Sequence, residues 1–180
     1  SVMFDGSNLP LSNNIKTSLS IVKLAKSYKV SVEGEVGIVG YHNGKISEGT
    51  KIIEAKKYAN ESGVDAMAIS VGNTHLQKSK IAKIDIKKII DIQNVTSTPL
   101  VLHGSSGISP TLRKQIARTT NVAKFNIGTE LRMVFGSSLR KYIKKDKKIF
   151  DRLKLLNPTT VNIKKETKKI IKNLSFDKNL

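Results

Sequence analysis

Five polar residues of the sequence each follow a short apolar run, and their types are those that bind metals or hydrogen-bond a reacting group. They are Asp5, Glu35, His75, His103 and Asn126. Imidazole nitrogens and carboxylate oxygens are the usual protein ligands of zinc and similar divalent ions. His75 and His103 therefore predict part of a metal site. Its third ligand would come from Glu35, from Asp5 or from outside this sequence.

One of these histidines sits in a pattern typical of an anion site. The apolar run 100–102 is too short for a helix and indicates a strand buried on both faces, with His103 at its carboxyl end. The small residues 104–107 allow a tight turn that points backbone N–H groups outward, and Ser109 caps the helix that follows. Such a loop at a helix N-terminus binds anions. The alternative is an ordinary strand, turn and helix with a histidine at the junction.

The elements that must position these residues alternate regularly between strand and helix. Apolar runs predict strands at 2–4, 30–37, 66–72, 100–102 and 122–127. Helical spacing of apolar residues predicts helices that begin near residues 12, 48, 85, 110 and 130, and a last basic helix at 158–174. This alternation is the signature of a parallel α/β protein, either an open sheet or a (β/α)8 barrel.

In both folds the carboxyl ends of the strands meet on one face and build the site. The loops 104–107 and 126–129 occupy the place where barrels commonly bind phosphate. A metal beside a phosphate site suits a phosphorylated sugar or keto compound whose carbonyl oxygen the metal polarises. A barrel needs about 250 residues and eight strand–helix units. With five units counted here, a barrel would lack about its first three strands, and we expect about 100 further residues upstream.

The composition argues against several classes of protein. The chain has 180 residues, no cysteine and a net charge of +18 at pH 7. No apolar run approaches the roughly 20 residues that cross a bilayer, so we expect no membrane span. The charge alone would suit nucleic-acid binding. The basic residues are mostly lysines rather than arginines, and only 5% of residues are aromatic, so the composition argues against nucleic-acid binding as the main role. No targeting signal is evident, and we expect a cytoplasmic protein.

Segments of the sequence resemble successive motifs of the class II, zinc-dependent ketose-bisphosphate aldolases, a family that includes fructose- and tagatose-bisphosphate aldolases. The segments are 1–7, 32–37, 63–75, 100–107 and 124–132. They occur in the order of the family and at compatible spacing. The resemblance implies a (β/α)8 TIM barrel, of which residues 1–180 would be the C-terminal portion of a single domain and cover about strands 4 to 8.

The resemblance also implies roles for individual residues. His75 and His103 match two of the three zinc-binding histidines, and Asp5 and Glu35 match positions of a second or alternative metal site, for a divalent or monovalent cation. The expected substrate-binding residues are Gly104, Ser105, Ser106, Asn126, Ile127, Gly128 and Thr129. Of these, Asn126 would act in catalysis by donating a hydrogen bond to the reacting enediolate.

The implied activity is the reversible cleavage of fructose or tagatose 1,6-bisphosphate to dihydroxyacetone phosphate and glyceraldehyde 3-phosphate. The partners implied are this phosphorylated sugar and a second or further copies of the chain, as a homodimer or homotetramer. The remaining zinc histidine and the catalytic aspartate of the family belong to the strand before Ser1. We therefore expect this chain alone to be inactive.

Three departures from the family pattern bear on activity. Leu76 and Ser105 stand where glycines are common, and the loop 41–44, with His42, lacks the usual acidic residues. At this position the protein backbone of the family contacts the substrate, and Leu76 would bring a side chain into that space. The alternative to an aldolase is a catalytically silent, aldolase-like barrel that binds a polyanion or a partner protein.

Overall fold

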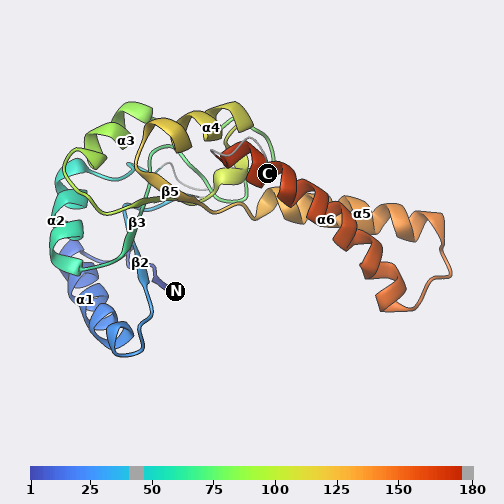
Figure 1. The fold of residues 1–180 in the computed structure, drawn as a ribbon, viewed down its shortest axis with the longest axis horizontal. Helices are drawn as coiled ribbons and strands as arrows, with labels where there is room; N and C mark the ends of the chain where they lie inside the picture. The colour runs from blue at the N-terminus through green and yellow to red at the C-terminus, as the bar shows by residue number, and fades with distance from the viewer. Residues whose placement is uncertain (41–46, 176–180) are drawn as a thin grey trace.

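The computed structural model describes residues 1–40 and 47–175 and builds them around a parallel sheet (Figure 1). Its strands are β1 (Val2–Phe4), β2 (Val32–Val36), β3 (Ala66–Ile69), β4 (Leu100–Leu102) and β5 (Val122–Phe125). Each strand pairs with the next one in the sequence, so the order across the sheet is β1-β2-β3-β4-β5. The predicted parallel α/β fold is confirmed, and this sequential order is that of neighbouring strands in a barrel wall.

A layer of helices runs along one side of the sheet (Figure 1). It consists of α1 (Leu11–Ser27), α2 (Ile52–Ser62), α3 (Ile86–Gln93) and α4 (Pro110–Thr119). The core between the helices and the sheet includes Val22, Tyr58, Met67, Ile89 and Ile116. Burying an apolar side chain of this size contributes about 1.5–3 kcal/mol. The helix layer thereby holds the strands and the loops that follow them in place.

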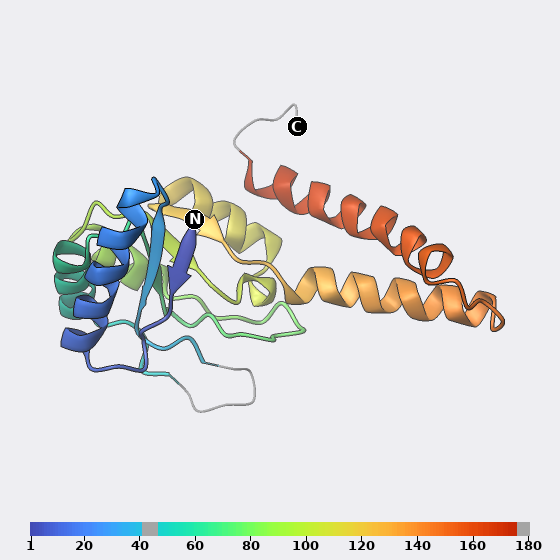
Figure 2. The same cartoon turned by 90° about the horizontal axis from the view of Figure 1, so that it is seen from below.

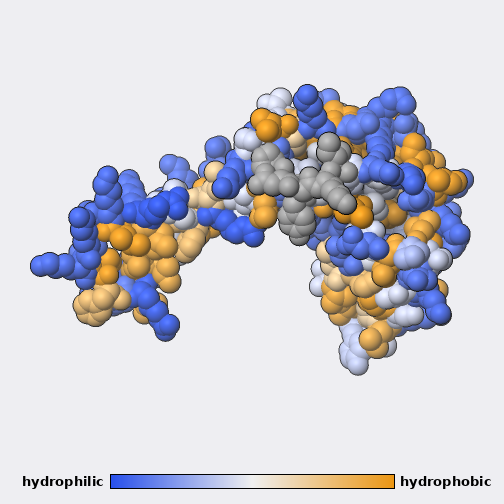
Figure 3. All heavy atoms as spheres, turned by 180° about the vertical axis from the view of Figure 1, so that it is seen from behind, coloured by the Kyte–Doolittle hydropathy of each residue, from blue (hydrophilic) through white to orange (hydrophobic). Residues whose placement is uncertain are grey.

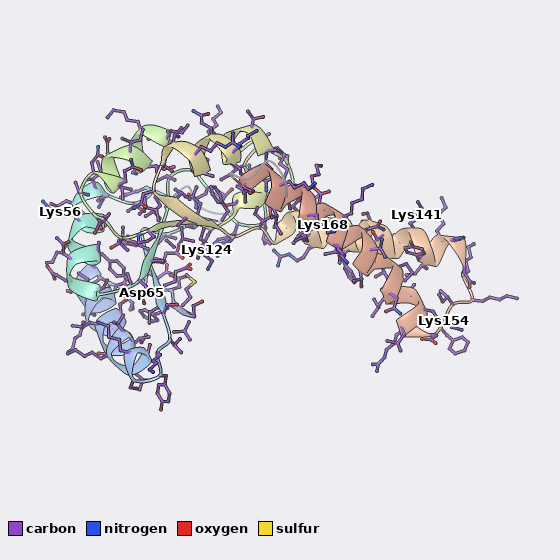
Figure 4. All side chains as sticks on the ribbon, viewed as in Figure 1. Lys56, Asp65, Lys124, Lys141, Lys154 and Lys168 are labelled. Atoms are coloured by element: carbon purple, nitrogen blue, oxygen red, sulfur yellow. The ribbon has the colours of Figure 1, made fainter. Side chains whose placement is uncertain are left out.

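Two long helices, α5 (Thr129–Lys145) and α6 (Arg152–Leu174), form a hairpin that projects from the sheet (Figure 2). Nδ2 of Asn162 donates a hydrogen bond to Oγ of Ser138 at 2.9 Å between them, and α6 also contacts α4. Lys141, Lys154 and Lys168 lie on this hairpin (Figure 4), and Figure 3 shows apolar side chains gathered between its charged ones. None of the described helices has the length and apolarity needed to cross a membrane.

Two helices begin at other residues than the sequence predicts. The N–H of Thr50 donates to the carbonyl of Ser70 at 2.8 Å, and its hydroxyl donates to the carbonyl of Val36 at 2.7 Å. These bonds tie 48–51 to the strand ends, so α2 begins at Ile52. The last helix begins at Arg152 rather than at 158, because the Asp151 carboxylate caps it there and Pro158 is accommodated inside the helix.

Strand β2 lies inside the sheet and all of its residues are buried, including Glu33 and Glu35. A solvent-facing edge strand, which its mixture of valine and glutamate also permits, is therefore excluded. The Asp65 carboxylate (labelled in Figure 4) fixes the start of this strand by accepting a hydrogen bond from the N–H of Val32 at 2.8 Å. The predicted loop 41–44, with His42, lies outside the described residues.

Candidate active site

The buried side chain of His103 lies between two carboxylates. Its Nε2 is 2.8 Å from Oε1 of Glu33, and its Nδ1 is 3.2 Å from Oε2 of Glu35. The other oxygen of Glu33 accepts a hydrogen bond from Nζ of Lys124 at 2.6 Å. The carboxylates come from β2, the histidine follows β4 and the lysine belongs to β5. Side chains of strands that are not neighbours thus converge on one side of the sheet.

This network sets the protonation of its members. Burial alone would lower the pKa of His103, but the hydrogen bonds to Glu33 and Glu35 outweigh it and raise that pKa to about 9. Burial would raise the pKa of Glu33, whereas the hydrogen bonds from His103 and Lys124 hold it below its usual 4.5. At pH 7 the His103 ring is therefore an imidazolium whose two N–H groups donate to carboxylates.

The second candidate ligand, His75, lies beside His103. The two ring centroids are 5.9 Å apart and the ring planes are inclined by 54°. Burial lowers the pKa of His75, and the positive charge of His103 lowers it further. A neutral imidazole keeps a lone pair on one ring nitrogen, which is the form that binds a metal.

The predicted metal-binding carboxylates lie in different surroundings. Glu35 is buried against His103, whereas Asp5 is exposed and accepts hydrogen bonds from the N–H and the hydroxyl of Ser7. Their negative charges both act on His75. Among the described residues, no group of three or more His, Cys, Asp or Glu side chains could hold one metal ion. The two histidines fit two positions of a zinc site, provided that one nitrogen of His103 leaves its carboxylate.

Residues of both predicted anion-binding loops line a pocket of about 440 Å³ beside His75. Its lining residues are His75, Leu76, Gly104, Ser106, Phe125, Asn126, Ile127, Gly128, Thr129 and Arg132. The guanidinium of Arg132 and the N-terminus of α5 both favour a bound anion here. A larger cleft of about 520 Å³, beside Gly37 and Lys51, includes neither histidine. The smaller pocket is the one that combines histidine, amide and guanidinium groups, so we take it as the candidate site.

The two loops of this pocket are bonded to each other. The N–H of Asn126 donates to the carbonyl of Leu102 at 2.9 Å, and the N–H of Ser105 donates to the carbonyl of Asn126 at 3.1 Å. The hydroxyl of Ser105 donates to the carbonyl of Leu102 at 2.7 Å. Ser105 is fully buried and is not among the lining residues, so its groups hold the loop together.

Sequence reasoning assigned no role to Glu33, Lys124 or Arg132, which the structure places in the His103 network and in the pocket. Glu33 precedes Glu35 by two residues, so both side chains project from the same face of a strand. Two glutamates on one face of a glycine-containing strand are a signal that cationic partners lie opposite. Which cations those are depends on the curvature of the sheet, which the sequence does not specify.

The pocket lies after the last two strands of this parallel α/β sheet, which is the place where barrels commonly bind phosphate. The family model of class-II fructose-bisphosphate aldolase matches residues 1–178, and the chain belongs to this family. The predicted family is thereby confirmed.

Solved structures of aldolases have the same fold. The YdjI aldolase of Escherichia coli K12 is 24% identical, with a TM-score of 0.76 over 97% of this chain and 59% of that one. The fructose-bisphosphate aldolase of Campylobacter jejuni is 20% identical, with a TM-score of 0.77 over 97% of this chain and 59% of that one. This chain therefore spans about three fifths of the length of these aldolases.

Proposed function

We propose that this chain carries much of the active site of a class II aldolase and acts within a longer polypeptide. The proposed reaction is the reversible cleavage of fructose or tagatose 1,6-bisphosphate to dihydroxyacetone phosphate and glyceraldehyde 3-phosphate. The supporting observation is the pocket in which His75 meets Gly104, Ser106 and the segment 126–129. A candidate metal ligand beside two anion-binding loops suits a substrate that carries both a carbonyl group and a phosphate.

Zinc is the cofactor that a pair of imidazoles favours. In this proposal His75 and His103 supply two of its ligands, and the third comes from outside the described residues. When bound, zinc acts as a Lewis acid that polarises the carbonyl group of the substrate. Glu33 orients the ring of His103 through their hydrogen bond. The negative charges of Glu35 and Asp5 act on His75, and we assign these two carboxylates to a second divalent or a monovalent cation.

The pocket residues bind and orient the substrate. The backbone N–H groups of Gly104, Ser106 and Thr129, which line the pocket, bind the phosphate in this proposal, and Arg132 adds a positive charge. On cleavage the C3–C4 bond breaks, its electron pair forms the enediolate, and the C4 hydroxyl gives its proton to a carboxylate from outside the described residues. Asn126 donates a hydrogen bond to the oxygen that gains negative charge.

A catalytically silent barrel with a binding role is the second candidate function. It is favoured by Leu76, whose side chain lines the pocket and whose backbone has a φ of +58°, a conformation that suits glycine.

For the enzyme we also propose a homodimer or homotetramer in the cytoplasm.

The test is aldol cleavage of both sugar bisphosphates by the protein at its natural length, with and without a chelator. We expect turnover that the chelator abolishes and zinc restores, and the faster substrate identifies the sugar. Zinc binding without turnover would contradict the aldolase and support the silent barrel. Absence of both zinc binding and turnover would contradict the metal site as well.

A second measurement tests the pocket in this chain itself. Inorganic phosphate is titrated into the chain and the amide shifts of Gly104, Ser106 and Gly128 are followed by NMR. We expect these amides to shift and Arg132→Met to weaken binding several-fold. Arg140→Met removes the same charge from α5 outside the pocket and should change binding little. Equal weakening by both variants would show that overall charge, and not the pocket, binds phosphate.

A further inference from the structure

A cluster of three charged side chains, Lys80, Arg113 and Glu130, lies next to the candidate phosphate pocket. Nζ of Lys80 is 2.5 Å and Nη1 of Arg113 is 3.0 Å from the same oxygen, Oε2 of Glu130. Burial would raise the pKa of Glu130, but the hydrogen bond from Lys80 and the charge of Arg113 outweigh it and lower that pKa. Glu130 is therefore an anion shared by two cations.

This cluster is bonded directly to Ser106, a residue that lines the pocket. Nζ of Lys80 donates to the carbonyl of Ser106 at 2.9 Å. The N–H of Glu130 donates to the hydroxyl of Ser106 at 3.0 Å. The backbone and the side chain of Ser106 are thus held by two different members of the cluster. Lys80 belongs to the segment that follows β3 and carries His75 and Leu76, so the cluster links all three segments that line the pocket.

The three members differ in how firmly they are held. The side chain of Arg113 is 1% exposed and that of Glu130 is 14% exposed, whereas that of Lys80 is 35% exposed. Within the described residues Nε of Arg113 has no hydrogen-bond partner, so Glu130 supplies the main compensation for this buried charge. The Arg113–Glu130 pair is therefore the fixed part of the cluster, and the contact with Lys80 is the part that can open.

The segment after β3 has a second connection to the 104–107 loop, because the N–H of Ala82 donates to the carbonyl of Gly107 at 3.1 Å. Lys80, Ser106 and Glu130 border a cavity of about 180 Å³ that also touches Gln77 and Met133. The side chain of Lys80 lies at the edge of this space, where its polar contacts join the segment to Ser106 and to Glu130 of α5.

We propose that Lys80 is a positioning residue for the phosphate pocket: through Ser106 and Glu130 it holds the His75 segment, the 104–107 loop and the start of α5 in one arrangement. The proposal rests on the proposed function in assigning the pocket to a phosphate group. It predicts that loss of Lys80 loosens the pocket loops even when no ligand is bound.

The variant is Lys80→Met, which keeps the Arg113–Glu130 pair, and the matched control is Lys78→Met, which removes the same charge from the same exposed segment. The first readout is hydrogen exchange of the Glu130 amide without phosphate. We expect exchange to accelerate about tenfold in Lys80→Met, as the loss of one charged hydrogen bond implies. Lys78→Met should exchange like the unchanged chain, and Lys80→Arg should restore most of the protection.

The second readout is the Kd of inorganic phosphate. We expect Lys80→Met to raise it about tenfold and Lys78→Met less than twofold, with the difference persisting in 0.5 M salt, where a through-space effect of charge is screened. Unchanged exchange at Glu130 would overturn the proposal. Phosphate binding that fails in the unchanged chain would contradict the proposed function alone, because the exchange experiment still decides the role of Lys80.

Discussion

Nε2 of His103 lies 2.8 Å from Oε1 of Glu33, although 70 residues separate the two in the sequence. Both side chains are 6% exposed. The contact joins the end of β4 to β2 across the strand between them, β3, and the curvature of the sheet makes it possible. A buried imidazolium depends on such a partner, because desolvation strongly disfavours an isolated charge.

Glu33→Ala is expected to lower the free energy of unfolding by about 2 kcal/mol, because it removes one of the two carboxylates that pair with the buried His103 imidazolium and leaves only Glu35. The matched control is Glu48→Ala, since Glu48 is 86% exposed and pairs with Lys51 at 3.8 Å. Surface pairs of this kind contribute little, so the control should unfold almost like the unchanged chain. Urea denaturation measures both variants. Similar losses for the two would show that the His103 network does not stabilise the fold.

Gly104→Ala is expected to destabilise the chain by about 3 kcal/mol. Gly104 has a φ of +62°, and a Cβ there would overlap the carbonyl oxygen of Thr74. Gly63→Ala separates the two causes, because Gly63 has a φ of +70° but a Cβ there would meet its nearest atom, Cγ1 of Val22, at 3.6 Å. The control should lose about 1 kcal/mol, the cost of the left-handed backbone alone. Equal midpoints in urea would rule out the close approach of the loop to Thr74.

Leu76→Gly is expected to tighten phosphate binding several-fold, because it removes a side chain that lines the pocket and relaxes a backbone with a φ of +58°. Leu76→Ala removes most of the side chain but keeps the backbone strain. If the size of the Leu76 side chain limits binding, both variants should bind phosphate more tightly. If the backbone conformation limits binding, only Leu76→Gly should bind phosphate more tightly. An NMR titration distinguishes these results, and unchanged affinity in both would show that Leu76 does not limit the pocket.

Acidification tests the environment of Glu130. Because its pKa is lower in the folded chain than its usual 4.5, its contribution to stability is complete above that value and is lost as the pH falls through the folded pKa. Between pH 5 and 3, thermal unfolding of the unchanged chain should shift to lower temperature more steeply than that of Glu130→Gln. Glu130→Gln should be the less stable variant at pH 7, since it leaves Arg113 buried without an anion. If the unfolding temperatures of the two chains fall equally with pH, the result would contradict Lys80 and Arg113 as the partners of Glu130.

The elements that local sequence patterns control could be predicted. The strand Leu100–Leu102 has the predicted bounds, and Ser109 caps the next helix through its hydroxyl, which accepts a hydrogen bond from the N–H of Leu112. Both features depend on residues that are close in the sequence. The alternation of strands and helices predicted a parallel sheet but permitted both an open sheet and a barrel, and the resemblance to a barrel family favoured the sequential strand order that the structure has.

Features that depend on distant residues could not be predicted in the same way. The segment 48–51 has helical periodicity, but the hydrogen bonds of Thr50 to Val36 and Ser70 hold it at the strand ends. Lys124 meets Glu33 across 91 residues of sequence because the sheet curves, and no local pattern encodes that curvature. The candidate site was predicted as a set of residue types at strand ends, whereas the hydrogen bonds that orient His103 required the structure.

The sequential pairing β1-β2-β3-β4-β5 also has a consequence for how the chain is made. Translation releases the strands in the order in which they pair, so each new strand emerges when its neighbour already exists. Each of these four pairings closes a loop of one strand–helix unit. A ribosome-bound nascent chain is therefore expected to acquire protease resistance in steps, one for each unit that has left the exit tunnel.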